Sequence, residues 1–159
     1  MGLYNNRIVV KVGTSTLTND VGKSDLRAID RPVCVLSDIQ NMGYEVVLVS
    51  SGAIAVGRNK LNMTSKPDSM RMKQAAAAVG QCSLMYLYDK FFGDYDKTVA
   101  QILLNAEDIE QEEKKENLIN TFNALLEMGV IPIVNENDSV SYKEIESEDR
   151  LFGDNDMLS

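Results

Sequence analysis

The chain has 159 residues, 44% hydrophobic and 25% charged, which suits one globular domain with a substantial core. Its formal net charge of −8 argues against a nucleic-acid-binding surface and against binding to an anionic membrane. Histidine is absent, which excludes Ser-His triads, imidazole bases and histidine metal sites. Cys34 and Cys82 lie in apolar helical contexts and the N-terminus is polar, so we expect a cytoplasmic protein with reduced core cysteines and no signal peptide.

Apolar runs and helical periodicity alternate along the chain. Strands are predicted over 8–12, 45–50, 98–104 and 130–134, and helices over 25–42, from about 53, over 69–92 and over 117–128. This alternation, with strands that are apolar almost throughout, predicts an α/β fold whose parallel sheet has helices on both faces. In such sheets, ligands bind beyond the carboxyl ends of the strands.

Four local features qualify this pattern. Pro32 must lie in the first turn of its helix, with Asp30 as N-cap, or kink the helix. Pro132 predicts that its strand starts there or lies at a sheet edge. The charged run 106–116 is interpreted as a solvated face. The small residues of 75–81 allow another backbone to pack close, either in the core or at a subunit contact.

Lys11 interrupts the apolar first strand. A lysine between two valines is costly to bury unless it meets an anion. Gly13 lets a ligand approach the backbone, and the N–H groups of Thr14 and Ser15 could bind a phosphate. The alternative is a lysine that extends to solvent from a strand edge. The sequence contains neither a P-loop nor a G-x-G-x-x-G motif after a strand, so any nucleotide site is of another type.

Polar residues also follow other strands. Ser51 and Gly52 precede a helix that starts near Ala53, which suits either an anion site or an ordinary N-cap. The segment 153–156 could orient an ammonium group or a hydrated Mg²⁺, or could cap a helix. The segments that follow the carboxyl ends of strands are expected to line one crevice: 13–15, 50–52 and 135–138.

Together, five motifs resemble the amino acid kinase family. They are VVKVGTS at 9–15, VSSGAIA at 49–55, AAVGQ at 77–81, VIPIVNEND at 130–138 and GDND at 153–156. They run from end to end of the chain, in the family's order and spacing. The NEND and GDND pair favours the members that phosphorylate glutamate over those that act on acetylglutamate, carbamate, aspartate or UMP.

The resemblance implies a three-layer αβα sandwich with a mainly parallel central sheet, truncated at its C-terminal side. Residues 1–159 would be the N-terminal, substrate-binding portion of an amino acid kinase domain. The implied reaction is ATP-dependent phosphorylation of the γ-carboxylate of L-glutamate to L-glutamyl 5-phosphate, the first step of proline biosynthesis, with ATP and Mg²⁺ as cofactors. A γ-carboxylate is ionised at pH 7 and needs no general base, which suits a chain without histidine.

The resemblance also assigns roles to individual residues. Lys11 would contact the transferring phosphoryl group, with Gly13, Thr14 and Ser15 around the ATP phosphates. Ser51, Gly52 and Ala53 would hold glutamate. Asp138 and Asn155 would hold its amino-acid end, with Asn135 nearby. Asp156 would orient the catalytic lysine. Lys11 and Asp156 are thus the catalytic assignments, and no residue is assigned as a metal ligand.

Three alternatives stay open at this point. They are another family member, such as an acetylglutamate or aspartate kinase, a non-catalytic glutamate-binding module, and a generic α/β scaffold. Family members carry a further segment with the adenine pocket and a second catalytic lysine, so we expect these 159 residues to be inactive alone. The resemblance implies a homo-oligomer, dimer or tetramer, with 69–92 as a candidate surface, and proline as a feedback inhibitor. No nucleic-acid or membrane partner is expected.

Overall fold

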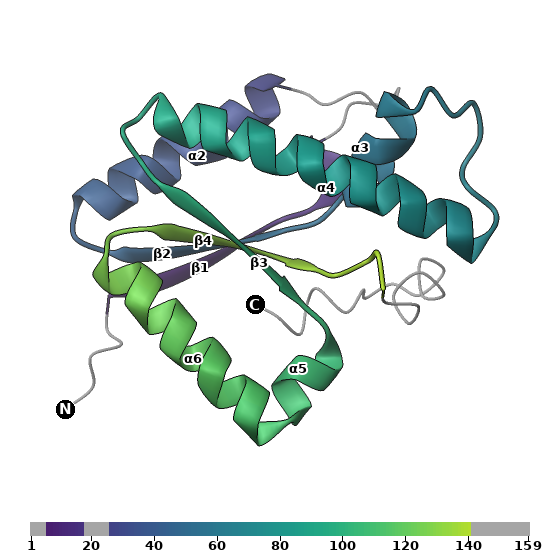
Figure 1. Cartoon of the computed structure of the whole chain (residues 1–159). Coiled ribbons are helices and arrows are strands. Elements are labelled where there is room, and N and C mark those ends of the chain that lie inside the picture. The colour runs from purple at the N-terminus through teal and green to yellow at the C-terminus, as the bar shows by residue number, and fades with distance from the viewer. Residues whose placement is uncertain (1–5, 18–25, 141–159) are drawn as a thin grey trace.

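The computed structural model describes residues 6–17 and 26–140. Within these ranges, four strands form one parallel sheet in the order β1-β2-β4-β3 (Figure 1). Their bounds are β1 Arg7–Val12, β2 Glu45–Ser50, β3 Val99–Leu104 and β4 Ile131–Glu136. The predicted parallel sheet is confirmed, and each predicted strand overlaps an observed one.

The helices cover both faces of the sheet. Their bounds are α1 Thr14–Leu17, α2 Leu26–Asn41, α3 Ala53–Lys60, α4 Met70–Gly93, α5 Ala106–Glu110 and α6 Glu112–Glu127. Figure 1 shows α2, α3 and α4 on one face and α5 and α6 on the other, so the three-layer α/β architecture is confirmed. Among the described helices, none is both long enough and apolar enough to cross a membrane.

Strand β2 supplies both cores because successive side chains of a strand point to opposite faces. Val46 and Leu48 belong to the apolar cluster under α2, α3 and α4. Val47 and Val49 belong to the cluster under α6. A strand buried on both faces has to be apolar throughout, which is the pattern the sequence shows.

Helix α2 differs from its prediction at Pro32. The helix starts at Leu26, so Pro32 is its seventh residue and the proposed N-cap at Asp30 is wrong. The missing N–H of proline removes one hydrogen bond. The helix nevertheless continues across it because Ile29 and Val33, on either side of the proline, are fully buried. Gly43 ends the helix as predicted: its φ is +92°, and its N–H donates to the carbonyl of Gln40 at 2.9 Å.

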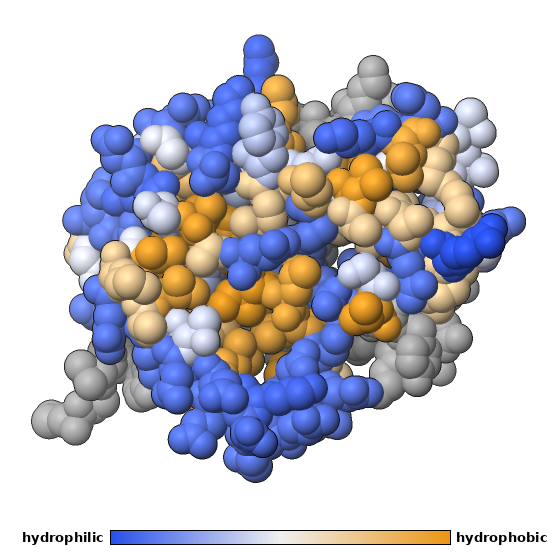
Figure 2. Space-filling model, viewed as in Figure 1, coloured by the Kyte–Doolittle hydropathy of each residue, from blue (hydrophilic) through white to orange (hydrophobic). Residues whose placement is uncertain are grey.

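Two further predictions need correction. Helix α6 begins at Glu112, five residues before the predicted start, because the acidic side chains of its first turn favour the helix N-terminus. Its early residues are nevertheless exposed, and Figure 2 shows a hydrophilic band over α5 and α6, as a solvated face requires. Pro132 is the second residue of β4, near the predicted strand start, but β4 lies between β2 and β3 and is not an edge strand.

The backbones of α3 and α4 touch at two glycines. A Cβ atom on Gly57 would lie 1.7 Å from the carbonyl oxygen of Ala76, and one on Gly80 would lie 1.7 Å from that of Ala53. No real Cβ tolerates such a distance, so both positions require glycine for this packing. The small residues predicted to admit another backbone therefore form a core contact within the chain. This contact places the first turn of α3 beside the middle of α4.

Replacing Gly80 by alanine tests this contact. We expect the free energy of unfolding to fall by about 3 kcal/mol, the upper part of the range for an overpacked core, because the obstructing atoms are backbone. Urea denaturation followed by circular dichroism measures the change.

Gly93, the last residue of α4, is the matched control because an added Cβ would meet nothing within 4 Å. Gly93→Ala should leave the free energy of unfolding unchanged or raise it by up to about 1 kcal/mol. Equal effects of the two substitutions would contradict the proposed backbone contact.

Candidate active site

The loops that follow β1 and β2 meet at the carboxyl edge of the sheet. The backbone N–H and the hydroxyl of Ser51 both donate to the carbonyl of Val12, at 3.2 Å each. A Cβ on Gly52 would lie 3.3 Å from Cα, Oγ1 and Cγ2 of Thr14, so the two loops are in close contact. The predicted meeting of these loops is confirmed.

Gly52 is the N-cap of α3 and has a φ of +91°, a conformation that glycine adopts without strain. Ser51 was predicted either to cap this helix or to bind a ligand. No side chain caps α3, and the Ser51 hydroxyl bonds instead to β1. Ser51 is therefore not the N-cap, and Gly52 takes that position. The first turn of α3, beginning with Ala53, has backbone N–H groups that could donate hydrogen bonds to an anion.

Asn135, the last residue but one of β4, lies inside the protein, where it is 1% exposed. Its Oδ1 accepts a hydrogen bond from the backbone N–H of Glu136 at 2.9 Å, and its Nδ2 donates to Oε1 of Gln81 at 2.7 Å. The N–H of Asn137 donates to the carbonyl of Leu104 at 3.0 Å, which ties this loop to the end of β3. These bonds fix the segment that leads to Asp138.

A second buried pair holds the end of β2. The hydroxyls of Ser50 and Tyr88 lie 2.9 Å apart, and the two residues are 2% and 1% exposed. Burial raises the pKa of Tyr88 to about 12, although the hydrogen bond with Ser50 partly opposes the rise. No pattern in the sequence indicates this pair, because Tyr88 has the spacing of an ordinary core residue.

A small cavity lies between the start of α3, the middle of α4 and the loop after β4. Its volume is about 20 Å³, the room for one water molecule, so an amino acid can enter only if the surrounding side chains move apart. The lining residues are Ala53, Ala77, Ala78, Gln81, Leu103, Glu136, Asn137, Asp138 and Ser139. Two predicted substrate-binding residues, Ala53 and Asp138, thus meet at one cavity. Gln81 was not predicted as a site residue, and Glu136 was predicted only as part of the segment 135–138.

Lys11 is exposed on β1, an edge strand of the described sheet. Of the two interpretations left open for Lys11, the lysine at a strand edge describes its position, and its contact with a phosphate stays a prediction. Gly13 follows, with no atom within 4 Å of an added Cβ, and both Thr14 and Ser15 are exposed. This open backbone fits the approach of a phosphate group.

The remaining predicted site residues, Asn155 and Asp156, lie outside the described residues together with the rest of 153–156. Among the side chains that the structure describes, no group of three or more Cys, Asp or Glu could hold a metal ion.

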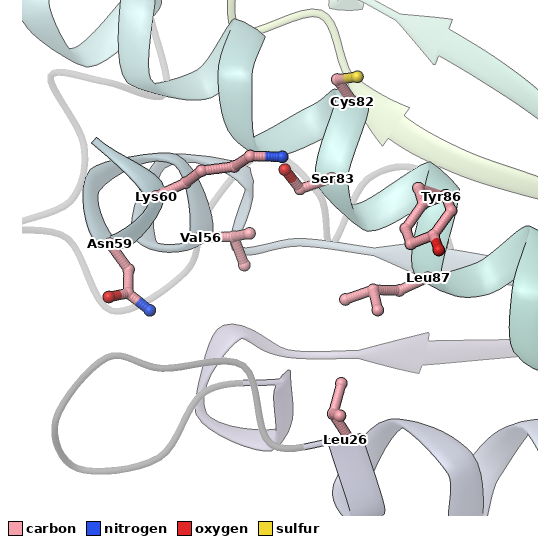
Figure 3. Close-up of a pocket in the computed structure, with 8 residues that line it drawn as sticks. All are labelled: Leu26, Val56, Asn59, Lys60, Cys82, Ser83, Tyr86 and Leu87. Carbon is pink, nitrogen blue, oxygen red and sulfur yellow. The ribbon is translucent and has the colours of Figure 1, made fainter. Parts of the chain in front are cut away.

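A larger cavity of about 630 Å³ lies between α2, α3 and α4 (Figure 3). It is lined by Leu26, Val56, Asn59, Lys60, Cys82, Ser83, Tyr86 and Leu87. Its lining is mainly apolar and includes none of the predicted site residues. Cys82, expected in the core, is exposed here. The first residue of α3 lines the small cavity and its last two residues line this one, so α3 separates the two.

Comparison with known proteins assigns the chain to a family. The model of the amino acid kinase family matches residues 6–159. The chain belongs to the amino acid kinase family. It is 59% identical over 153 residues to a glutamate 5-kinase of Clostridium perfringens, and 50% identical to glutamate 5-kinases of Listeria innocua and Enterococcus faecalis. Each match covers 96% of this chain and 55–56% of the relative, so the chain spans little more than half the length of these proteins.

In this amino acid kinase chain, Tyr88→Phe tests the buried hydroxyl pair. The substitution leaves the Ser50 hydroxyl without its partner, which should lower the free energy of unfolding by about 1–3 kcal/mol at pH 8. Above pH 10 the unfolded tyrosine loses its proton, whereas Tyr88 keeps its proton to about pH 12. The unfolded state then binds fewer protons, so the wild type loses about 1.4 kcal/mol relative to the variant by pH 11.

Urea denaturation of both proteins at pH 8 and pH 11 measures this change. The chain has six tyrosines, and the other five are common to both proteins and cancel in the difference. A stability difference that is the same at both pH values would contradict the raised pKa.

Proposed function

We propose that the protein phosphorylates the γ-carboxylate of L-glutamate with ATP, giving L-glutamyl 5-phosphate for proline biosynthesis, and that these residues form its amino-acid-binding portion. The observation that carries the proposal is the 50–59% identity to glutamate 5-kinases over 96% of the chain. The meeting of Ala53 and Asp138 at one cavity supports it, because the sequence assigned both to the same substrate.

The charges around the small cavity suit the two ends of an amino acid. The carboxylates of Glu136 and Asp138 line the cavity and attract an α-ammonium group. On the α3 side, the backbone of Gly52 and Ala53 offers N–H groups and the positive end of the helix to a carboxylate. Ser51 would act here by holding this loop against β1, as its hydrogen bonds to Val12 indicate.

The phosphoryl group would arrive over the adjacent β1 loop. The open backbone at Gly13 and the exposed Thr14 and Ser15 fit the phosphates of ATP, which supplies the phosphoryl group. Mg²⁺ in kinases is held largely by nucleotide phosphates and water. Lys11, at the end of β1, would bring positive charge to the transferring group. The glutamate carboxylate needs no base, so positioning is the main task of this portion.

Three expectations from the sequence stay predictions: the cytoplasmic location, feedback inhibition by proline, and assembly into a dimer or tetramer. Exposed apolar side chains on α4, Met72 and Tyr86, keep this helix a candidate subunit surface. Its small residues Ala76, Ala77 and Gly80 are buried and do not contribute to such a surface.

Calorimetric titration of the folded chain with L-glutamate tests the proposal. We expect L-glutamate to bind in preference to N-acetylglutamate, aspartate and UMP. Asp138→Asn should raise the dissociation constant for L-glutamate at least tenfold, because a hydrogen bond to a charged group contributes about 1.5–3 kcal/mol. Asp89→Asn is the matched control, since Asp89 is exposed on α4 and does not line the cavity.

Tight binding of acetylglutamate or aspartate instead would favour another branch of the family. Equal L-glutamate affinities of wild type and Asp138→Asn would contradict the proposed site. Glutamate-dependent release of ADP by these 159 residues alone would contradict their assignment to the binding portion only.

A further inference from the structure

One backbone N–H determines how two side-chain amides point at the end of β4. A backbone N–H can only donate, so the atom of Asn135 that faces the N–H of Glu136, at 2.9 Å, must be the carbonyl oxygen. The amino group of Asn135 then faces the other way, toward Gln81 at 2.7 Å. That amino group is also only a donor, so Gln81 must present its Oε1 to it.

The amino group of Gln81 is therefore directed away from Asn135. Gln81 lines the small cavity, whereas Asn135 does not. Nε2 is thus the polar atom of Gln81 that can serve this cavity, and it donates no hydrogen bond to another described residue. Gln81 is half-buried, and Nε2 is not among the fully buried unpaired atoms of the described residues, so water or a ligand that accepts a hydrogen bond can reach this donor.

We propose that Nε2 of Gln81 donates a hydrogen bond to the α-carboxylate of the amino-acid substrate, with Asn135 as the positioning residue that sets the direction of this amide. The inference rests on the proposed function. A carboxylate oxygen is about the size of the water that the cavity can hold. Glu136 and Asp138 line the same cavity. The substrate's ammonium group would therefore meet these acidic residues, while the neighbouring α-carboxylate would meet the amino group of Gln81.

The competing explanation is that Gln81 only joins α4 to β4. Gln81→Glu separates the two explanations, because a glutamate still accepts the hydrogen bond from Asn135 but offers an oxygen to the cavity in place of a donor. Gln81→Leu removes both the hydrogen bond that joins α4 to β4 and the N–H donor that faces the cavity. A structural joint predicts that only Gln81→Leu weakens ligand binding, whereas a substrate donor predicts that both substitutions do.

The experiment is calorimetric titration of each folded variant of the chain with L-glutamate and with L-isoglutamine, in which the α-carboxylate is an amide. We expect Gln81→Glu to weaken L-glutamate binding at least tenfold. The preference of the wild type for L-glutamate over L-isoglutamine should shrink by a similar factor in this variant, since the lost partner is the α-carboxylate.

Asn135→Asp provides an independent arm that leaves Gln81 unchanged. The introduced carboxylate would still accept from the N–H of Glu136 but would now also attract the amino group of Gln81, so the amide would turn and present its oxygen to the cavity. We again expect at least tenfold weaker L-glutamate binding. If circular dichroism shows that Gln81→Glu does not fold, the L-glutamate titration of Asn135→Asp decides the test.

Wild-type affinity for L-glutamate in Gln81→Glu, or in Asn135→Asp where Gln81→Glu does not fold, would overturn the inference and leave the proposed function standing. A folded wild-type chain that binds no L-glutamate would instead contradict the proposed function and this inference with it. The two failures are thus distinguishable by the wild-type titration.

Discussion

The backbone contact between α3 and α4 is the constraint on which the candidate site depends. Because Gly57 and Gly80 carry no side chains, the two helices approach until each glycine lies against a carbonyl of the other helix. This approach sets the first turn of α3 beside Ala77 and Gln81 and close to the loop after β4. A larger residue at either glycine would separate the helices and move one wall of the cavity away from the other. The contact therefore links helix packing directly to substrate binding.

Around this contact, buried hydrogen bonds fix the ends of the central strands. Ser50 is held by Tyr88, and Asn135 by Gln81, so two positions of α4 fasten the carboxyl ends of β2 and β4. Buried polar groups are costly unless paired, which makes each pair specific for one arrangement of helix and strand. The loops that follow these strands are polar and face the cavity and the exposed edge. Rigid strand ends with polar loops beyond them are what a kinase needs to position two reactants.

Much of the fold could be predicted from the sequence because its signals are local. The four apolar strands, the glycine that ends α2 and the close packing at 75–81 each follow from a short run of residues. The order of strands in the sheet is not a local property. For that reason the sequence left open whether Pro132 marks a strand start or an edge strand, and β4 proves to be central. It also left open whether Lys11 is buried against an anion or lies at a strand edge, and β1 is an edge of the described sheet.

The candidate site was predicted in part. Strand-end motifs identified the loops that meet, since parallel strands bring their carboxyl ends to one edge. They did not identify Gln81 or Tyr88, because both lie within a long helix whose spacing predicts only packing. Their importance depends on hydrogen bonds to residues 54 and 38 positions away in the chain. Such long-range pairs leave no periodic pattern in a single sequence.

The central claim is that an amino acid binds at the carboxyl edge of the sheet and not in the larger apolar cavity. Amide chemical-shift mapping of the ¹⁵N-labelled chain during a titration with L-glutamate tests it most directly. We predict that the shifts concentrate at 51–53, Gln81 and 135–138, with Asn59, Lys60 and Tyr86 unchanged. Shifts concentrated at Asn59, Lys60 and Tyr86 would place the ligand between α2, α3 and α4 and contradict the account.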